Sequence, residues 1–392
     1  MLNCNGKSSL AALAASMMAL SALLSCSQAS TVGVTPLGLA SPAFKVTSTW
    51  STGDVDTSGD VGQYTSLAFD PDDGYPAISY YYATGGDLKY AKWNGSSWNI
   101  QTVDSTDDIG QWTSLAFNSD GDPSIAYYDV TNGNLKWAFD DNDDGDFSDE
   151  GEILTVDSSA DDCGKYASID WYGSSKCGFT YYNDTDDDLN YAEYLVGLWR
   201  VSVPIDESGD VGKYCSFKFD PDDGTPTVSY YDATNGNLKF AYEAGRPLTW
   251  YPSNVDTTND VGQWTSLAYD GEGYPSIGYY DVTNANVKWA WNEDGGGWDI
   301  YTVNNSANDV GKYLSHDWYS TTKAGFSYYD DTGDDLYYSQ CLIVLWQISS
   351  VEVDATNDVG RWTSTKYNSS GSGRISYYYV TGGDLRFAEW SD

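Results

Sequence analysis

The sequence predicts an all-β fold, a seven-bladed β-propeller built from four-stranded antiparallel blades. A motif seen as NDVGQWTSLAYD at 259–270 and DDIGQWTSLAFN at 107–118 recurs seven times along the chain. Its central glycine steps by 48, 54, 48, 50, 49 and 49 residues, standing at Gly62, Gly110, Gly164, Gly212, Gly262, Gly311 and Gly360. Val, Ile, Tyr, Trp and Thr fill the runs of each unit, which show no helical periodicity. Seven such units of about 50 residues are typical of a propeller.

Each repeat is predicted to form four short strands with turns between them. In the first repeat, the strand segments are YTSLAFD, AISYYYA, LKYAKW and WNIQTVD. The segments between them, PDDGYP, TGGD and NGSS, consist of turn-forming residues. The other six repeats follow the same order, so we expect the same blade seven times.

The two ends of the repeat array complement each other. The last repeat stops after its third strand, at DLRFAEWSD, whereas FKVTSTWSTGDVD at 44–56 precedes the first repeat and matches a fourth strand. We therefore expect this N-terminal strand to complete the last blade and close the ring, leaving no open seam. The predicted domains are a lipoprotein-type signal peptide at 1–25, a linker at 26–43 and the propeller at 44–392.

A second periodicity joins repeats 1 and 4 (FDPDDG), 2 and 5 (YYDVTN) and 3 and 6 (DWY), which indicates a duplicated three-blade unit. The SYYD-x-T and D-V-G phrases resemble those of bacterial secreted propeller repeat proteins over nearly all of the mature chain. The repeated WD dipeptide, the paired glycine of kelch repeats and the sialidase Asp box do not occur. The resemblance thus implies the fold and brings no catalytic residues with it.

The N-terminal residues predict an export signal. The apolar run from about Leu10 to Leu24 is shorter than the roughly 20 residues that span a bilayer and suits a signal-peptide core. Leu23-Leu24-Ser25-Cys26 resembles a bacterial lipobox, which predicts lipidation of Cys26; cleavage near Ala29 is the alternative. Both predict an exported protein: an outer-membrane lipoprotein, a cell-surface protein or a secreted one.

The net charge of the chain disfavours some classes of binding partner. With 58 acidic and 19 basic residues the formal charge is −39, which disfavours nucleic acid and anionic lipid. We expect a monomer that meets the membrane only through its lipid anchor and binds a carbohydrate or an extracellular protein. The four remaining cysteines permit disulfides whose pairing the sequence leaves open: Cys163, Cys177, Cys215 and Cys341.

The candidate ligand site surrounds the repeated glycine, on the loop face around the channel. An aspartate lies two residues before each glycine: Asp60, Asp108, Asp162, Asp210, Asp260, Asp309 and Asp358. An aromatic lies two residues after it: Tyr64, Trp112, Tyr166, Tyr214, Trp264, Tyr313 and Trp362. The aspartates either fix their loops by accepting backbone hydrogen bonds or hold a cation. The aromatics either pack between blades or form stacking platforms for a sugar.

One acidic turn breaks the repeat, at FDDNDDGDFSDEGE (139–152). Asp140, Asn142, Asp144 and Gly145 match the start of a calcium loop, and Asp146 and Glu150 are further candidate Ca²⁺ ligands. The twelfth position is Gly151 where such a loop needs an acid, so a solvated acidic hairpin remains the alternative.

Residues for catalysis are sparse. His316 is the only histidine and the five arginines are scattered, so neither a Ser-His-Asp constellation nor an arginine triad is indicated. The sequence predicts a non-catalytic binding scaffold that recognises a carbohydrate or a partner protein. The alternatives are a carbohydrate-active enzyme, either a glycoside hydrolase or a polysaccharide lyase, and a purely structural envelope protein.

Overall fold

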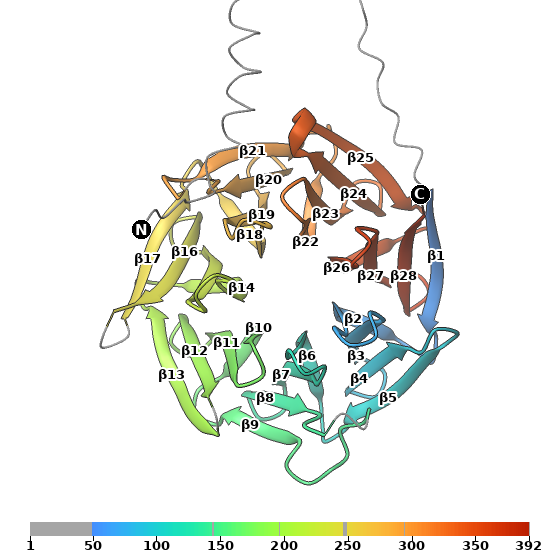
Figure 1. Cartoon of the computed structure of the whole chain (residues 1–392), viewed down its shortest axis with the longest axis vertical. Helices are drawn as coiled ribbons and strands as arrows, with labels where there is room; N and C mark the ends of the chain where they lie inside the picture. The colour runs from blue at the N-terminus through green and yellow to red at the C-terminus, as the bar shows by residue number, and fades with distance from the viewer. Residues whose placement is uncertain (1–48, 143–144, 196, 246–248, 294, 392) are drawn as a thin grey trace, which may run out of the picture. The chain divides into compact units, whose positions relative to one another are not determined.

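The computed structural model describes residues 49–391, except 143–144, 196, 246–248 and 294. Its strands form seven four-stranded antiparallel sheets arranged radially around a central channel (Figure 1). The predicted seven-bladed propeller is therefore confirmed. The predicted signal peptide, Cys26, the predicted linker and residues 44–48 of the predicted first strand lie outside the described residues. The described part contains no helix with the length and apolar character of a membrane crossing.

Blade 1 contains β2 to β5, blades 2 to 6 take the next strands in fours, and blade 7 contains β26 to β28 with β1. The innermost strands are Val61–Phe69 (β2), Ile109–Phe117 (β6), Cys163–Tyr172 (β10), Val211–Phe219 (β14), Val261–Tyr269 (β18), Val310–Tyr319 (β22) and Val359–Tyr367 (β26). The second strands are Pro76–Tyr82 (β3), Pro123–Asp129 (β7), Lys176–Asn183 (β11), Pro226–Asp232 (β15), Pro275–Asp281 (β19), Lys323–Asp330 (β23) and Gly373–Tyr379 (β27). The third strands are Asp87–Trp93 (β4), Asn134–Phe139 (β8), Asp188–Leu195 (β12), Asn237–Ala244 (β16), Asn286–Trp291 (β20), Asp335–Leu342 (β24) and Asp384–Ser391 (β28). The outermost strands are Trp98–Asp104 (β5), Ile153–Asp157 (β9), Leu198–Asp206 (β13), Thr249–Asp256 (β17), Asp299–Asn304 (β21), Gln347–Asp354 (β25) and Thr49–Asp56 (β1).

The N-terminal strand closes the ring as predicted. β1 pairs antiparallel with β28, with Trp50 opposite Trp390 and Thr52 opposite Ala388. Blade 7 thus takes three strands from the end of the chain and one from its beginning. This pairing covers the edge of β28, which would otherwise present unpaired backbone groups.

Each blade interface contains a buried polar contact. The first tyrosine of each strand-2 pair is fully buried, at Tyr80, Tyr127, Tyr181, Tyr230, Tyr279, Tyr328 and Tyr377. Tyr80 donates to Asp56 at the end of the preceding blade's outer strand (2.7 Å), and Lys89 pairs with the same carboxylate (2.5 Å). A tyrosine–aspartate bond recurs at six of the seven interfaces, with a lysine on the aspartate at four of them, so these tyrosines belong to the core.

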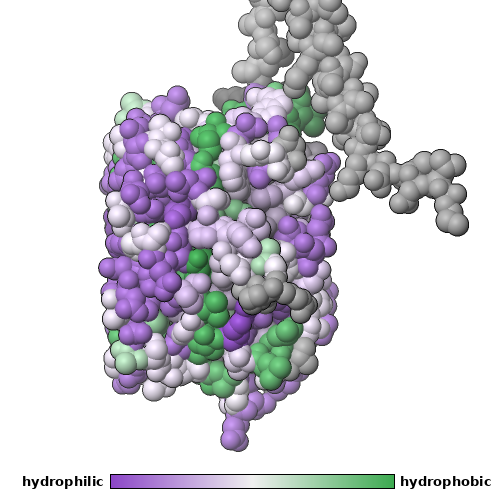
Figure 2. All heavy atoms as spheres, turned by 90° about the vertical axis from the view of Figure 1, so that its left-hand side faces the viewer, coloured by the Kyte–Doolittle hydropathy of each residue, from purple (hydrophilic) through white to green (hydrophobic). Residues whose placement is uncertain are grey.

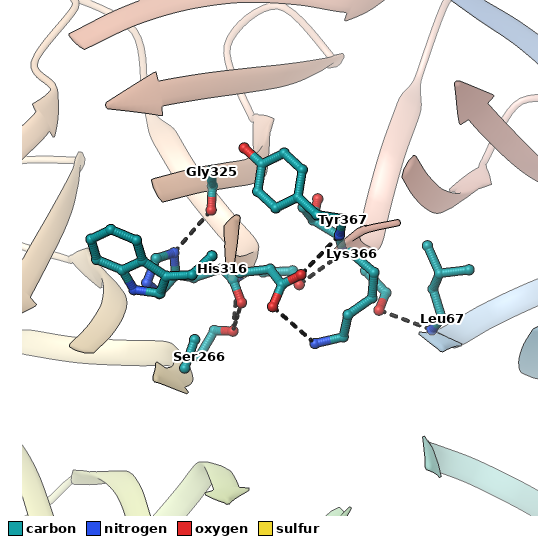
Figure 3. Close-up of polar contacts among 12 residues, drawn as sticks. Leu67, Ser266, His316, Gly325, Lys366 and Tyr367 are labelled. Atoms are coloured by element: carbon teal, nitrogen blue, oxygen red, sulfur yellow. Dashed lines mark hydrogen bonds and ion pairs between the residues drawn. The ribbon is translucent and has the colours of Figure 1, made fainter. Parts of the chain in front are cut away.

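The innermost strands are sheet edges, and a serine on each supplies the partner that a backbone N–H of the next blade needs. Ser66 accepts from the N–H of Leu115 (3.0 Å). Ser364 of blade 7 accepts from the N–H of Leu67 of blade 1 (3.0 Å; Figure 3), across the interface that we call the closing seam. The seven serines are Ser66, Ser114, Ser168, Ser216, Ser266, Ser315 and Ser364. Together they link the blades into a continuous ring around the channel.

The outer part of each interface is filled by an aromatic side chain that packs on the third strand of the preceding blade. Trp50 lies 5.0 Å from Tyr338, and Trp250 lies 5.1 Å from Tyr191, between ring centroids. We call these side chains the wedge residues. The others are Trp98, Phe147, Trp199, Trp298 and Trp346. Figure 2 shows that the side it displays is largely hydrophilic, with apolar residues in narrow patches.

The four cysteines of the propeller are all buried free thiols, so no disulfide joins them. Burial raises the pKa of Cys163 to about 12 and that of Cys341 to about 11. These thiols are therefore protonated at neutral pH and unsuited to nucleophilic attack.

Candidate functional site

The seven predicted aromatics form a closed ring in the channel. Adjacent ring centroids are 4.9 to 5.4 Å apart at each of the seven steps, and adjacent planes are tilted by 47° to 56°. Each aromatic also contacts the second tyrosine of its own blade's strand-2 pair, as Trp112 does with Tyr128 (5.4 Å). The ring lines a cavity of about 200 Å³ together with the residues that follow each aromatic, among them Thr113 and Cys215.

An unusual backbone directs these side chains into the channel. All seven aromatics have left-handed φ angles, between 47° and 56°, which cost a non-glycine residue about 1 kcal/mol or more. The pairing register shifts on both sides of Gln63, so each inner strand is bulged at this point. The glycine two residues earlier is required, because a Cβ on Gly62 would lie 2.7 Å from the Cα of Leu385.

The cavity wall is rich in neutral hydrogen-bonding groups. Four of the seven aromatics are tyrosines, and burial raises the pKa of Tyr64 to about 12, with Tyr313 and Asp108 adding to the effect. Burial also raises the pKa of Tyr166, and the nearby Tyr214 hydroxyl contributes. The phenols therefore stay protonated at neutral pH. Three tryptophans complete the ring, so the wall offers hydroxyl and indole N–H donors beside apolar ring surface.

The seven predicted aspartates are half-buried and contact the preceding blade. Tyr81 donates to Asp108 (2.7 Å) and Tyr378 donates to Asp60 (2.6 Å), in each case from the preceding blade. The aspartate N–H donates to a threonine hydroxyl, as Asp60 does to Thr84 (3.0 Å). In four blades a cation pairs with the carboxylate, at Lys165, Lys213, Lys312 and Arg361. These contacts favour the structural interpretation of the aspartates over a ring that holds a cation.

The single histidine lies away from the cavity. His316 is 1% exposed, stacks on Phe326 at 4.4 Å, and places Nδ1 2.9 Å from the carbonyl of Gly325 (Figure 3). Its Nε2 lies 2.7 Å from Ser276 Oγ. Burial lowers the pKa of His316 to about 3, so the ring is neutral and packed, as a core residue is.

Two ion pairs on the innermost strands were not anticipated. Asp170 pairs with Lys218 (2.9 Å), one blade apart. Asp317 likewise lies 3.8 Å from Lys366 of the next blade (Figure 3). Burial lowers the pKa of Lys366, with Lys218 adding like charge. The equivalent positions in blades 1, 2 and 5 are Ala68, Ala116 and Ala268. Alignment of the repeats against one another would have singled out these charges, because they replace alanine.

The acidic turn of blade 2 shows no converging ligand set in its described part. Asp140 Oδ2 accepts from the N–H of Gly145 (3.0 Å), and Asn142 donates to Asp149 (2.9 Å). Asp146 accepts from the N–H of Ser148 (2.8 Å). No three acidic, histidine or cysteine side chains gather as a metal site would require within the described residues. Asp144 lies outside them, so calcium binding stays a prediction.

Comparisons with known proteins bear on the fold. No protein-family model matches the chain, and no curated protein matches it. A Dyadobacter fermentans protein of unknown function superimposes with a TM-score of 0.54 at 12% identity, over 87% of this chain and 97% of that one. YCF48 from Cyanidioschyzon merolae gives 0.54 at 8% identity, over 86% and 98%. The shared fold is the β-propeller.

A third similar structure is that of AofleA from Arthrobotrys oligospora, with a TM-score of 0.50 at 14% identity, over 79% of this chain and 91% of that one. At such identities the likeness concerns the fold alone. The site must therefore be interpreted from its own residues.

Proposed function

We propose that this protein is an exported, non-catalytic binding propeller whose channel mouth recognises a neutral carbohydrate. The observation that carries the proposal is the closed ring of seven aromatics around the 200 Å³ cavity. Seven left-handed backbone conformations hold that ring in place, and such strain is concentrated at functional sites. Apolar ring surface beside neutral donors suits a ligand that presents hydroxyl oxygens and C–H faces.

The charge of the molecule supports a neutral ligand. At −39 the chain repels anions at long range, and four of the seven rim carboxylates are already paired with a cation. Among the described residues, the histidine and the cysteines are also unsuited to act as catalytic bases or nucleophiles. His316 is neutral and buried, and the cysteines are protonated, which favours binding over catalysis.

A glycan array with residues 27–392, run with calcium and with a chelator, tests the proposal. We expect specific binding of neutral glycans, weakened at least tenfold by Trp112→Ala and by Trp264→Ala. Trp112→Phe keeps a ring in place but removes the indole N–H, so it separates loss of the ring from loss of one donor. Tyr251→Ala is the matched control, because Tyr251 is 46% exposed on β17 and stacks on Tyr242, away from the channel.

The array separates the alternatives. Binding that survives both tryptophan variants contradicts the channel-mouth site. Binding lost only in chelator, with the tryptophans intact, supports a calcium role for the turn at 139–152. Cleavage of an immobilised glycan would favour the carbohydrate-active enzyme, and absence of any binding would favour a protein partner. Mass spectrometry of the exported protein tests the proposed lipid on Cys26, which would anchor the propeller outside the cytoplasm.

A further inference from the structure

We propose that the seam where the ring closes holds a second ligand site, for a neutral saccharide. The site is a pocket of about 430 Å³ between blade 7 and blade 1, with the N-terminal strand β1 forming one wall. It is larger than the channel-mouth cavity and falls in the size range of small-molecule sites. The ligand class follows the proposed function, but the location is independent of the channel mouth.

One position of β1 in the wall of the pocket carries no side chain. The residue three before the end of each outer strand is Gly53 in blade 7, and in blades 1 to 6 it is Gln101, Leu154, Val203, Ser253, Tyr301 and Val351. A Cβ on Gly53 would meet no atom within 4 Å. The backbone of Gly53 also lies outside the left-handed region, so nothing in its conformation requires glycine.

At two other seams a side chain occupies the corresponding space. Tyr301 lies 5.5 Å from the wedge residue Trp346 of the next blade. Gln101 donates to the carbonyl of Gly145 (2.9 Å), in the acidic turn whose Phe147 packs on Tyr90. At the closing seam Gly53 leaves the same space open in front of the wedge Trp98. A site that differs from its symmetry equivalents is what recognition of one ligand would require.

The apolar part of the wall consists of aromatic rings from both blades. Trp98 lies 5.3 Å from Phe387 of blade 7 and 5.5 Å from Trp93, both in edge-to-face arrangements. Tyr75, in the turn before β3, is 39% exposed at the pocket. Such rings provide flat surfaces against which the C–H face of a sugar ring can pack.

The polar part of the wall carries charges that are already paired. Arg374 donates to Glu389 Oε1 (2.9 Å) and to Ser372 Oγ (2.6 Å), and Arg386 donates to Asp54 (2.9 Å). A ligand therefore need not neutralise any of them. The side chains of Asp54 and Glu389 remain 51% and 52% exposed, so they can still accept hydrogen bonds from hydroxyl groups. Paired charges beside aromatic rings suit a neutral polyol.

Filling the pocket from the backbone tests the proposal without altering the other lining side chains. We expect titration calorimetry on residues 27–392 to show two sites for the neutral array glycans, of which Gly53→Leu weakens one at least tenfold. Gly53→Ser adds one oxygen and should retain binding. Val351→Leu is the matched control, because it enlarges the same strand position in blade 6 and should bind as the parent does. The thermal midpoint should not fall in Gly53→Leu, because its side chain enters open space.

The channel-mouth variant separates the two sites. Loss of one site in each of Gly53→Leu and Trp112→Ala supports both locations. Loss in Gly53→Leu but not in Trp112→Ala supports the seam site and overturns the channel-mouth site. Loss in Trp112→Ala but not in Gly53→Leu overturns the seam site and leaves the proposed function standing. Parent-like binding in both variants overturns both locations, and failure of every neutral glycan to bind overturns the ligand class itself.

Discussion

At the scale of single residues, the buried aspartates between blades are the most consequential groups in the molecule. Burial by itself would raise the pKa of Asp56, but bonds from Lys89, Ser58 and Tyr80 outweigh burial and hold the pKa below its ordinary value of 3.8. The same balance lowers the pKa of Asp104, Asp206 and Asp256. A carboxylate with a lowered folded-state pKa stabilises the fold at neutral pH, and that stabilisation is lost as the pH falls through the folded-state pKa.

Removing one cation from this set should be costly. Asp56 and Lys89 are 4% and 10% exposed, so Lys89→Met leaves a buried carboxylate without its cation and should lower the free energy of unfolding by about 3–5 kcal/mol. Urea unfolding at pH 7 measures the loss, which should shrink toward pH 3 as Asp56 is protonated in the variant. A loss that does not change with pH would contradict the electrostatic explanation.

The seam between blades 5 and 6 suggests the matching control. There Asn304 replaces the aspartate and Tyr337 stands at the lysine position, so the charge and its partner are absent together. The double variant Asp56→Asn with Lys89→Tyr copies that seam. We expect it to recover at least half of the stability lost in Lys89→Met.

At the scale of elements, the seven innermost strands show how a sheet edge can be buried. Ser66→Ala would leave the N–H of Leu115 without its partner in a half-buried setting, at about 1–3 kcal/mol. Faster hydrogen exchange at the Leu115 amide, measured by NMR, should accompany the loss. Ser96→Ala, in the exposed turn before β5, should change neither quantity. Equal effects of the two substitutions would contradict a role for the serine ring.

The strands themselves were predictable, and their special residues were only partly so. Turn-forming residues and the sevenfold period placed every blade, because alternation along a half-buried strand follows directly from burial. The motif also located the aromatics, but not their left-handed backbone, which only glycine ordinarily signals. Ser66 belongs to the same motif, because a serine lies four residues after the glycine in all seven repeats, but the sequence does not show that its hydroxyl bonds to the next blade. Gly53 becomes informative only when the outer strands are compared with one another and the space beside it is known.

At the scale of the whole molecule, closure depends on one eight-residue strand. A chain that begins at Thr57 lacks β1, and therefore exposes the edge of β28, removes the partner of Tyr80 and Lys89, and loses the Trp50 wedge. We expect that chain to self-associate, because an unpaired edge invites pairing with another chain. Size-exclusion chromatography with light scattering measures this, and a chain that begins at Thr49 is the control. A monomeric truncated chain with an unchanged thermal midpoint would contradict this account of closure.

The pairing of β1 with β28 also determines when the propeller can complete its folding. Thr49 lies opposite Ser391, so the first strand to be synthesised must wait for nearly the whole chain to follow before its partner exists. At about 5–20 residues per second, that interval is tens of seconds for a ribosome. During it blades 1 to 6 can assemble in turn while blade 7 cannot. A chain still in that interval is an open ring without its last interface.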